Sequence, residues 1–197
     1  RKWINLLLSY NYIFGGKETT AGLTVRNKKG RTAIIVNRYP RELFNYQPPS
    51  VSVSNILPGN IGYINLGGLK VAEVEDTFLK LKDCHAIIFD VRNQCRDILT
   101  YITYNLLESQ QPFAKIVFPN LDYPGTYIWK EASKTGPTKP YKNNYKGKVV
   151  LLVNENCISH DEWTTMALQT VPGSVTIGSQ TAGADGNIFL LLLPGKI

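Results

Sequence analysis

Long hydrophobic segments are missing from this sequence of 197 residues. Its longest apolar run, which includes Phe189 to Leu193, is short enough to be one buried strand and falls well below the roughly 20 residues of a membrane helix. The chain opens with Arg1 and shows no charged stretch followed by an apolar one, so any targeting segment was removed or lies upstream. We predict no membrane-spanning segment in this chain.

Metal-binding residues are also scarce. The two histidines, His85 and His160, and scattered carboxylates form no ligand set, so we predict no metal site and no cofactor. The three cysteines, Cys84, Cys95 and Cys157, lack metal-ligand spacing, and each lies in or beside an apolar strand-like segment. This placement predicts buried free thiols.

The sequence also lacks a basic surface organised to bind nucleic acid. The net charge is +7, but no helix or aromatic ladder organises the basic residues. They are scattered at Lys28, Lys29, Arg31, Lys139, Lys142, Lys146 and Lys148. We predict a solvated basic surface and no nucleic-acid partner. With 43% hydrophobic and 19% charged residues, the composition is that of a globular chain.

The first 58 residues divide into a β-rich part and a proline-rich part. Thr20 to Asn27 and Thr32 to Arg38 are β-rich runs joined by a turn that contains Gly30, which predicts a hairpin. Because an isolated two-stranded ribbon is marginal in water, residues 1–38 are expected to close a small β domain. Residues 39–58 contain four prolines and are expected to be a linker or a crossing strand. A new domain is expected from about Gly59.

From residue 59 onward, strands and helices alternate in the sequence pattern. This alternation predicts an α/β fold with a largely parallel sheet. The expected strands are Ile61 to Leu66, Ala86 to Val91, Lys115 to Phe118, Lys148 to Val153 and Ser174 to Ile177. The expected helices are Val71 to Leu81, Asp97 to Leu107 and His160 to Thr170. The long polar segment Pro119 to Lys146 is expected to cover another part of the domain.

Three polar segments follow predicted strands and are expected to meet, because ligands gather beyond the carboxyl ends of such strands. They are Asp90 to Cys95, Asn154 to Ser159 and Gly178 to Gly186. Ser159 stands where a strand, a loop and a helix meet, so helix N–H donors would surround its hydroxyl. That setting suits a nucleophile, since negative charge develops beside it. A capping box between Ser159 and Glu162 explains the same spacing and stays open.

Four short motifs in order resemble the C-terminal processing, or tail-specific, serine protease family. They are Gly62-Tyr63-Ile64, Asp90-Val91-Arg92, the pair Ser159 and Glu162, and the loop glycines Gly178 and Gly183 with Thr181. The resemblance implies a core like that of Clp protease and crotonase over residues 59–197, incomplete at its C-terminus. It also implies that residues 1–38 end a PDZ-like domain. The loop Thr181 to Asn187 is similar to envelope members from gut Bacteroidetes, which implies a place outside the cytoplasm, in the periplasm or cell envelope.

Carried onto this chain, the resemblance makes Ser159 the catalytic nucleophile. The oxyanion donors would be the backbone N–H of His160 and one from the loop at Gln94 or Cys95. The family usually has glycines where this chain has residues 93–96, Asn-Gln-Cys-Arg. Its well-known members use a lysine base in the loop near the site, and the aligned residue here is Ala184.

Three other residues, Asp185, His85 and His160, are candidates for the base. Asp185 follows Ala184. A role in structuring the loop that contains Thr181 and Gly183 explains this aspartate better than a role as the base. His85 lies at the amino end of its strand, about 15–20 Å from the carboxyl-end site at ~3.3 Å per residue. His160 is expected at the rim, since helix neighbours point about 100° apart.

The sequence thus predicts a serine peptidase that cleaves protein or peptide substrates through an acyl-enzyme, with substrate bound in a cleft under Pro119 to Lys146. A catalytically inactive relative that binds peptides or acts as a scaffold is the alternative. An acyl-CoA enzyme is suggested by fold analogy alone. No oligomeric state is indicated.

Overall fold

The computed structural model describes residues 18–38 and 52–186, which belong to two units, 1–51 and 52–197. The described part of the first unit is an antiparallel hairpin of β1 (Thr20–Asn27) and β2 (Gly30–Asn37). The predicted hairpin is therefore confirmed. The assignment of residues 1–38 to a PDZ-like domain stays a prediction. Residues 39–51 of the predicted linker and the apolar run after residue 186 lie outside the described residues.

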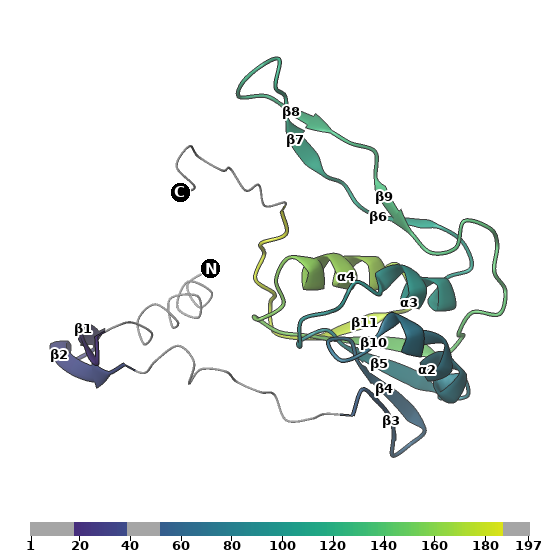
Figure 1. The fold of residues 1–197 in the computed structure, drawn as a ribbon, viewed down its shortest axis with the longest axis horizontal. Helices are drawn as coiled ribbons and strands as arrows, with labels where there is room; N and C mark the ends of the chain where they lie inside the picture. The colour runs from purple at the N-terminus through teal and green to yellow at the C-terminus, as the bar shows by residue number, and fades with distance from the viewer. Residues whose placement is uncertain (1–17, 39–51, 187–197) are drawn as a thin grey trace. The chain divides into compact units, whose positions relative to one another are not determined.

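A five-stranded sheet forms the centre of the second unit, in the order β11-β10-β5-β4-β3 (Figure 1). Its strands are β3 (Ser54–Leu57), β4 (Ile61–Asn65), β5 (Ala86–Asp90), β10 (Lys148–Val153) and β11 (Val175–Gly178). All neighbours run parallel except β3, which pairs antiparallel with β4. The predicted largely parallel α/β fold is confirmed. β3 lies within 39–58, the segment expected to be a linker or a crossing strand.

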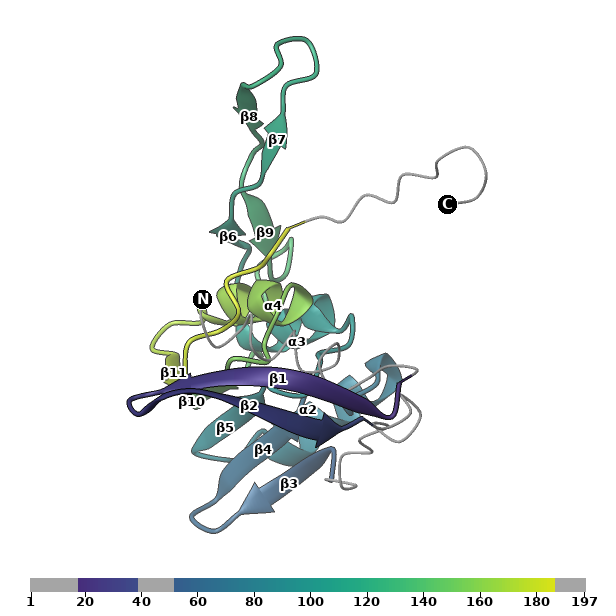
Figure 2. The same ribbon diagram turned by 90° about the vertical axis from the view of Figure 1, so that its left-hand side faces the viewer.

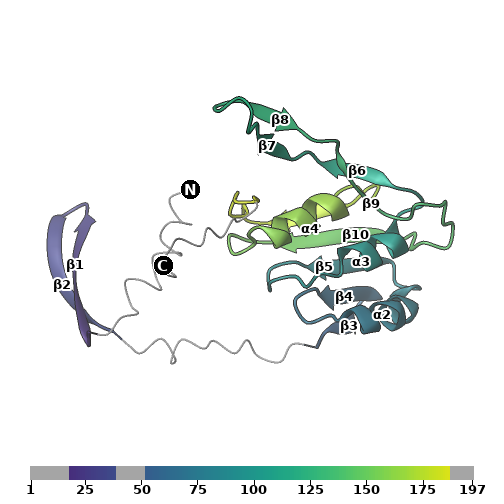
Figure 3. The ribbon, with the colours of Figure 1, turned by 45° about the horizontal axis from the view of Figure 1, so that its top comes forward.

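One face of this sheet is buried and the other is half-buried. Ile64, Phe89 and Leu151 lie side by side in the strand register and are fully buried. Their sequence neighbours, such as Tyr63 and Leu152, are half-buried, as the alternation of side chains along a strand requires. Helices α2 (Val74–Leu81), α3 (Leu99–Leu106) and α4 (His160–Leu168) lie beside the sheet (Figure 3) and, with the loops that join them to the strands, add further residues to the core.

The helices are shorter than the sequence predicts. A 3-10 turn, Val71–Glu73, precedes α2, and Val71 in this turn is 44% exposed. In α3, Tyr101 is exposed, whereas Ile98 and Ile102 are buried. The buried face of each of these helices is therefore narrower than the apolar pattern of the sequence suggests.

The polar segment 119–146, which is expected to cover another part of the domain, instead contributes to a long β ribbon. It comprises β6 (Gln111–Ala114) paired with β9 (Ser133–Thr135), and β7 (Val117–Pro119) paired with β8 (Tyr127–Trp129). Phe113 packs edge-on against Trp163 of α4, with ring centroids 4.7 Å apart. Beyond that contact the ribbon projects from the body (Figure 2), so the expected covering role is wrong for β8. β7 overlaps the expected strand Lys115 to Phe118 but pairs with β8 rather than with the central sheet. No helix within 18–38 and 52–186 is long and apolar enough to cross a bilayer.

Candidate active site

A hollow of about 500 Å³ lies at the carboxyl ends of the central strands. It brings Ser159 and His160, at the start of α4, together with Gln94 and Cys95 from the loop after β5. Gly67, Asn93, Arg96, Ile158 and Asp161 complete the lining. The predicted nucleophile and the predicted oxyanion donors therefore line one hollow.

Ser159 has an unusual backbone at the strand-to-helix junction. Its φ of 53° and ψ of −112° fall outside the right- and left-handed helical regions and outside the extended region of an ordinary N-cap. Such strain costs about 1–3 kcal/mol and concentrates at functional sites. The Ser159 N–H donates to Glu162 Oε2 at 3.2 Å, and the Glu162 N–H approaches the Ser159 side chain, so both contacts of a capping box are present, although the second does not reach the geometry of a full hydrogen bond. A capping box thus accounts for the Glu162 contact but leaves the backbone conformation unexplained.

Glu162 joins the start of α4 to the loop that follows β11. Its Oε1 accepts the Thr181 hydroxyl and the Gly183 N–H, both at 2.7 Å, and its Oε2 accepts the Ala184 N–H at 2.8 Å. Burial alone would raise the pKa of Glu162, but these hydrogen bonds and the one from Ser159 hold it below its usual value. The carboxylate therefore stays ionised and fixes the loop beside Ser159.

Neither loop residue proposed near the base position contacts the Ser159 hydroxyl. Ala184 offers only a methyl group, and its N–H is engaged by Glu162. Asp185 lines a separate hollow of about 580 Å³ between α4, β11 and the loop. Burial and the nearby Glu162 charge raise the pKa of Asp185, with His160 opposing them. A raised pKa improves a carboxylate as a base, but Asp185 and Ser159 line different hollows.

The loop after β5 is held on both sides. Arg96 Nε donates to the Gly67 carbonyl at 3.1 Å, and the Arg96 carbonyl lies 3.3 Å from His160 Nε2. The Cys95 N–H donates to Asp161 Oδ1 at 2.7 Å. The Cys95 N–H, a predicted oxyanion donor, is therefore already engaged in a hydrogen bond. Among the described residues, the N–H groups of Gln94 and His160 have no protein acceptor.

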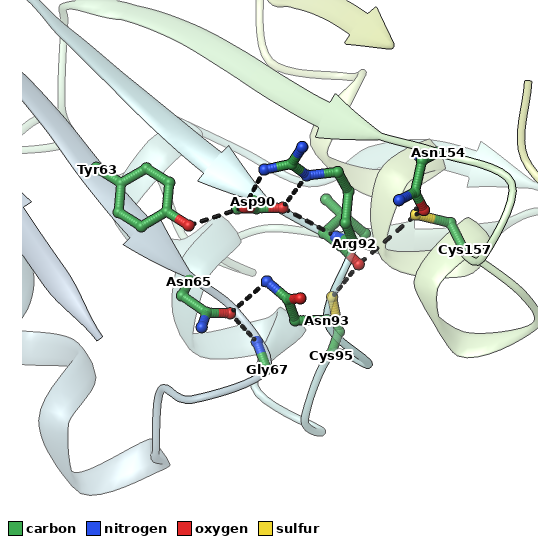
Figure 4. Close-up of polar contacts among 10 residues, drawn as sticks. Tyr63, Asn65, Gly67, Asp90, Arg92, Asn93, Cys95, Asn154 and Cys157 are labelled. Carbon is green, nitrogen blue, oxygen red and sulfur yellow. Dashed lines mark hydrogen bonds and ion pairs between the residues drawn. The ribbon is translucent and has the colours of Figure 1, made fainter. Parts of the chain in front are cut away.

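A buried carboxylate orients the start of the same loop (Figure 4). Asp90 is 1% exposed and accepts Arg92 Nε and Nη2 at 2.8 and 2.7 Å and the Tyr63 hydroxyl at 2.8 Å. Burial would raise the pKa of Asp90, but the bonds from Arg92 and Tyr63 hold it below its usual value. Burial, with Asp90 beside it, raises the pKa of Tyr63 to about 12. The ion pair fixes the chain direction as it leaves β5.

This cluster predicts a loss of stability in acid. A carboxyl whose folded pKa is lowered stabilises the fold above its unfolded pKa of about 3.9, and this contribution is lost as the pH falls through the folded value. We expect the free energy of unfolding to drop below about pH 4, and Asp90→Asn to flatten that drop while destabilising the protein at pH 7. Urea unfolding at a series of pH values measures this. Asp122→Asn, at an exposed ribbon position, is the control. An unchanged acid limb in Asp90→Asn would contradict the assignment.

The remaining predicted groups are distributed as follows. His85 precedes β5, at the amino end of the sheet, where its N–H donates to the Asn60 carbonyl. His160 is half-buried and lines the hollow. All three cysteines are free, as predicted; Cys84 and Cys157 are buried, whereas Cys95 is half-buried.

Sequence reasoning missed three contributors to this site. Asp161, the Tyr63 hydroxyl and Asn65 were not singled out, although Asn65 Oδ1 accepts the Gly67 N–H at 3.1 Å and Asn93 Nδ2 at 3.3 Å. A carboxylate two residues after a candidate nucleophile, in the first helical turn, was an available signal for Asp161. For Asn65 the signal was its place near the end of a predicted strand, and Tyr63 belongs to the Gly62-Tyr63-Ile64 motif, which does not reveal the partner of its hydroxyl.

Comparison with known proteins gives a family and a fold. The model of peptidase family S41 matches residues 60–195. No curated protein matches the chain. A candidate peptidase from Parabacteroides merdae superposes with a TM-score of 0.59 at 18% identity, covering 73% of this chain and 47% of that one. Mature CPAF complexed with lactacystin superposes with a TM-score of 0.56 at 11% identity, covering 89% and 56%. This chain thus spans about half the length of these solved structures.

Proposed function

Because the chain belongs to peptidase family S41, as its resemblance to the tail-specific proteases predicted, we propose that it hydrolyses peptide bonds through an acyl-enzyme on Ser159. The backbone of Ser159 carries this proposal. Ser159 is a strained residue at a strand–turn–helix junction, the kind of turn on which nucleophiles are held. The start of α4 adds N–H donors and positive potential, which stabilise developing negative charge.

The proposed reaction uses groups that line the hollow. Ser159 Oγ would attack the substrate carbonyl, and the N–H groups of His160 and Gln94 would receive the oxyanion. Water would then release the acyl group. The substrate would be a protein or peptide, and the resemblance of the loop that begins at Thr181 supports action in the cell envelope.

One observation favours a different function. The position of the family's lysine base is occupied by Ala184, and no described side chain forms a hydrogen bond with Ser159 Oγ. The alternative is a peptide-binding or scaffolding relative that kept the fold without catalysis. It predicts that peptides bind in the same hollow and are released intact.

A covalent serine probe separates the two functions. We expect a fluorophosphonate to label the wild-type protein and not Ser159→Ala, and we expect casein cleavage to disappear in the same variant. Ser179→Ala, at an exposed serine outside the hollow, is the matched control and should label normally. A well-folded wild-type protein with neither labelling nor cleavage would overturn the catalytic proposal and leave the binding function.

A further inference from the structure

The loop opposite Ser159 has a conformation that its sequence does not favour. Gln94 has a φ of 55°, in the left-handed region that glycine adopts freely and other residues adopt at a cost of about 1–2 kcal/mol. Gln94 is exposed, so its own side chain packs against little that could offset this cost. Another group must therefore hold the loop.

Asp161 is placed to hold it. The residue is 2% exposed and lies in the first turn of α4, two residues after Ser159. Its Oδ1 accepts the Cys95 N–H at 2.7 Å, a short, charge-assisted contact across 66 positions of the chain. Its Oδ2 lies 3.5 Å from the Ile158 N–H. One buried carboxylate thus links the Cys95 peptide to the segment that contains the nucleophile.

We infer that Asp161 is a positioning residue that clamps the loop of residues 93–96 and so keeps the Gln94 N–H, rather than the Cys95 N–H, available as an oxyanion donor. The inference rests on the proposed function for its catalytic meaning. A glycine would adopt the left-handed conformation at little cost. At Gln94, the hydrogen bond from Cys95 to Asp161 offsets that cost instead. It acts on the reaction only through the loop, because Asp161 Oδ1 is occupied by Cys95.

Cys95 provides a readout of the clamp that does not depend on catalysis. Its thiol is half-buried and lies 3.8 Å from the Val91 carbonyl. Burial, followed by the charge of Asp161, raises the pKa of this thiol, so alkylation should be slow while the loop is closed. Release of the loop should expose Cys95, while Cys84 and Cys157 stay protected in the core.

The experiment compares Asp161→Ala, Asp161→Asn and the double variant Asp161→Ala/Gln94→Gly with the wild-type chain. Iodoacetamide labelling of each cysteine, followed by peptide mass spectrometry, and fluorophosphonate labelling of Ser159 are measured on the same samples. Asp161→Asn removes the charge but keeps an acceptor for the Cys95 N–H. It therefore separates the hydrogen bond from the direct effect of charge on the thiol.

We expect Asp161→Ala to speed Cys95 alkylation about tenfold and to slow Ser159 labelling about 100-fold, the effect of a displacement near 1 Å. Asp161→Asn should keep Ser159 labelling close to wild type and should speed Cys95 alkylation much less than Asp161→Ala does, because it removes the charge but not the hydrogen bond. The Gln94→Gly change should restore part of the Ser159 labelling lost in Asp161→Ala, because glycine adopts the left-handed conformation without the clamp.

Three results would overturn the inference. The first is wild-type protection of Cys95 in Asp161→Ala. The second is equal exposure of all three cysteines, which would mean general unfolding. The third is slowed Ser159 labelling with no recovery from Gln94→Gly. If the wild-type protein reacts with no serine probe, the proposed function fails, and the clamp is decided by Cys95 protection alone.

Discussion

Replacing Glu162 with alanine is expected to lower the free energy of unfolding by about 3 kcal/mol and to release the loop of residues 181–184. The carboxylate accepts hydrogen bonds from Ser159, Thr181, Gly183 and Ala184. Hydrogen bonds to a charged group contribute about 1.5–3 kcal/mol each, but the N–H groups of the exposed Gly183 and Ala184 regain water when the carboxylate is removed. The expected loss is therefore well below the sum of four bonds.

Urea unfolding measures the stability, and hydrogen exchange of the Gly183 and Ala184 amides reports the loop. Glu155→Ala is the matched control, because Glu155 is exposed and its side chain bonds to the nearby Ser179 hydroxyl rather than to the loop of residues 181–184. It should change stability by less than about 0.5 kcal/mol. Slow exchange at Gly183 and Ala184 in Glu162→Ala would show that the loop is held by something else.

The central sheet was predictable because its signal is local. Short apolar runs mark β4, β5 and β10, and the predicted strands differ from the observed ones by at most one residue at the carboxyl end. The bounds of β3 were not predicted, since prolines on both sides of it left a linker and a crossing strand as alternatives. The Pro58-Gly59 pair before β4 was a turn signal that marks the β3–β4 hairpin, with Gly59 at a φ of 83°.

The ribbon shows the opposite case, in which composition misleads. Polar residues and prolines in 119–146 suggested an irregular cover, yet Pro124-Gly125 forms a turn between β7 and β8, with Gly125 at a φ of 87°. Strands of three or four residues are too short for alternation to be recognised. Pairing, rather than propensity, defines them.

Parts of the candidate site were predictable, since strand ends and a helix start mark Ser159, Gln94 and Thr181 from the sequence alone. The contacts between them were not. Glu162 binds backbone N–H groups of the loop, and every residue type except proline offers that donor, so no side-chain pattern reveals the pairing. The same holds for Asp161 and the Cys95 N–H. Only the folded chain brings these groups together.

Gly67→Ala is expected to have the largest effect on the site, because the loop opposite Ser159 leaves no room for a side chain there. A Cβ on Gly67 would lie 1.9 Å from the Asn93 carbonyl oxygen and 2.8 Å from its carbon. Both are backbone atoms, so Asn93 must move by about 1 Å or more, and the loop must move with it. We expect a loss of stability of about 2–3 kcal/mol and a fall in serine-probe labelling of about 100-fold.

The neighbouring glycine provides the control for this change. A Cβ on Gly68 would lie 3.1 Å from Val53 Cγ2, a side-chain atom that can move by a few tenths of an ångström. Gly68→Ala should therefore keep stability within about 1 kcal/mol and label at nearly the wild-type rate. Thermal unfolding and fluorophosphonate kinetics on both variants give the comparison. If the two variants have equal stability and equal labelling rates, the loop that contains Asn93 can move without affecting either property. Contact with Gly67 would then not position this loop. A selective loss in Gly67→Ala would show that the close approach of the two backbones, and not glycine flexibility, fixes the loop opposite Ser159.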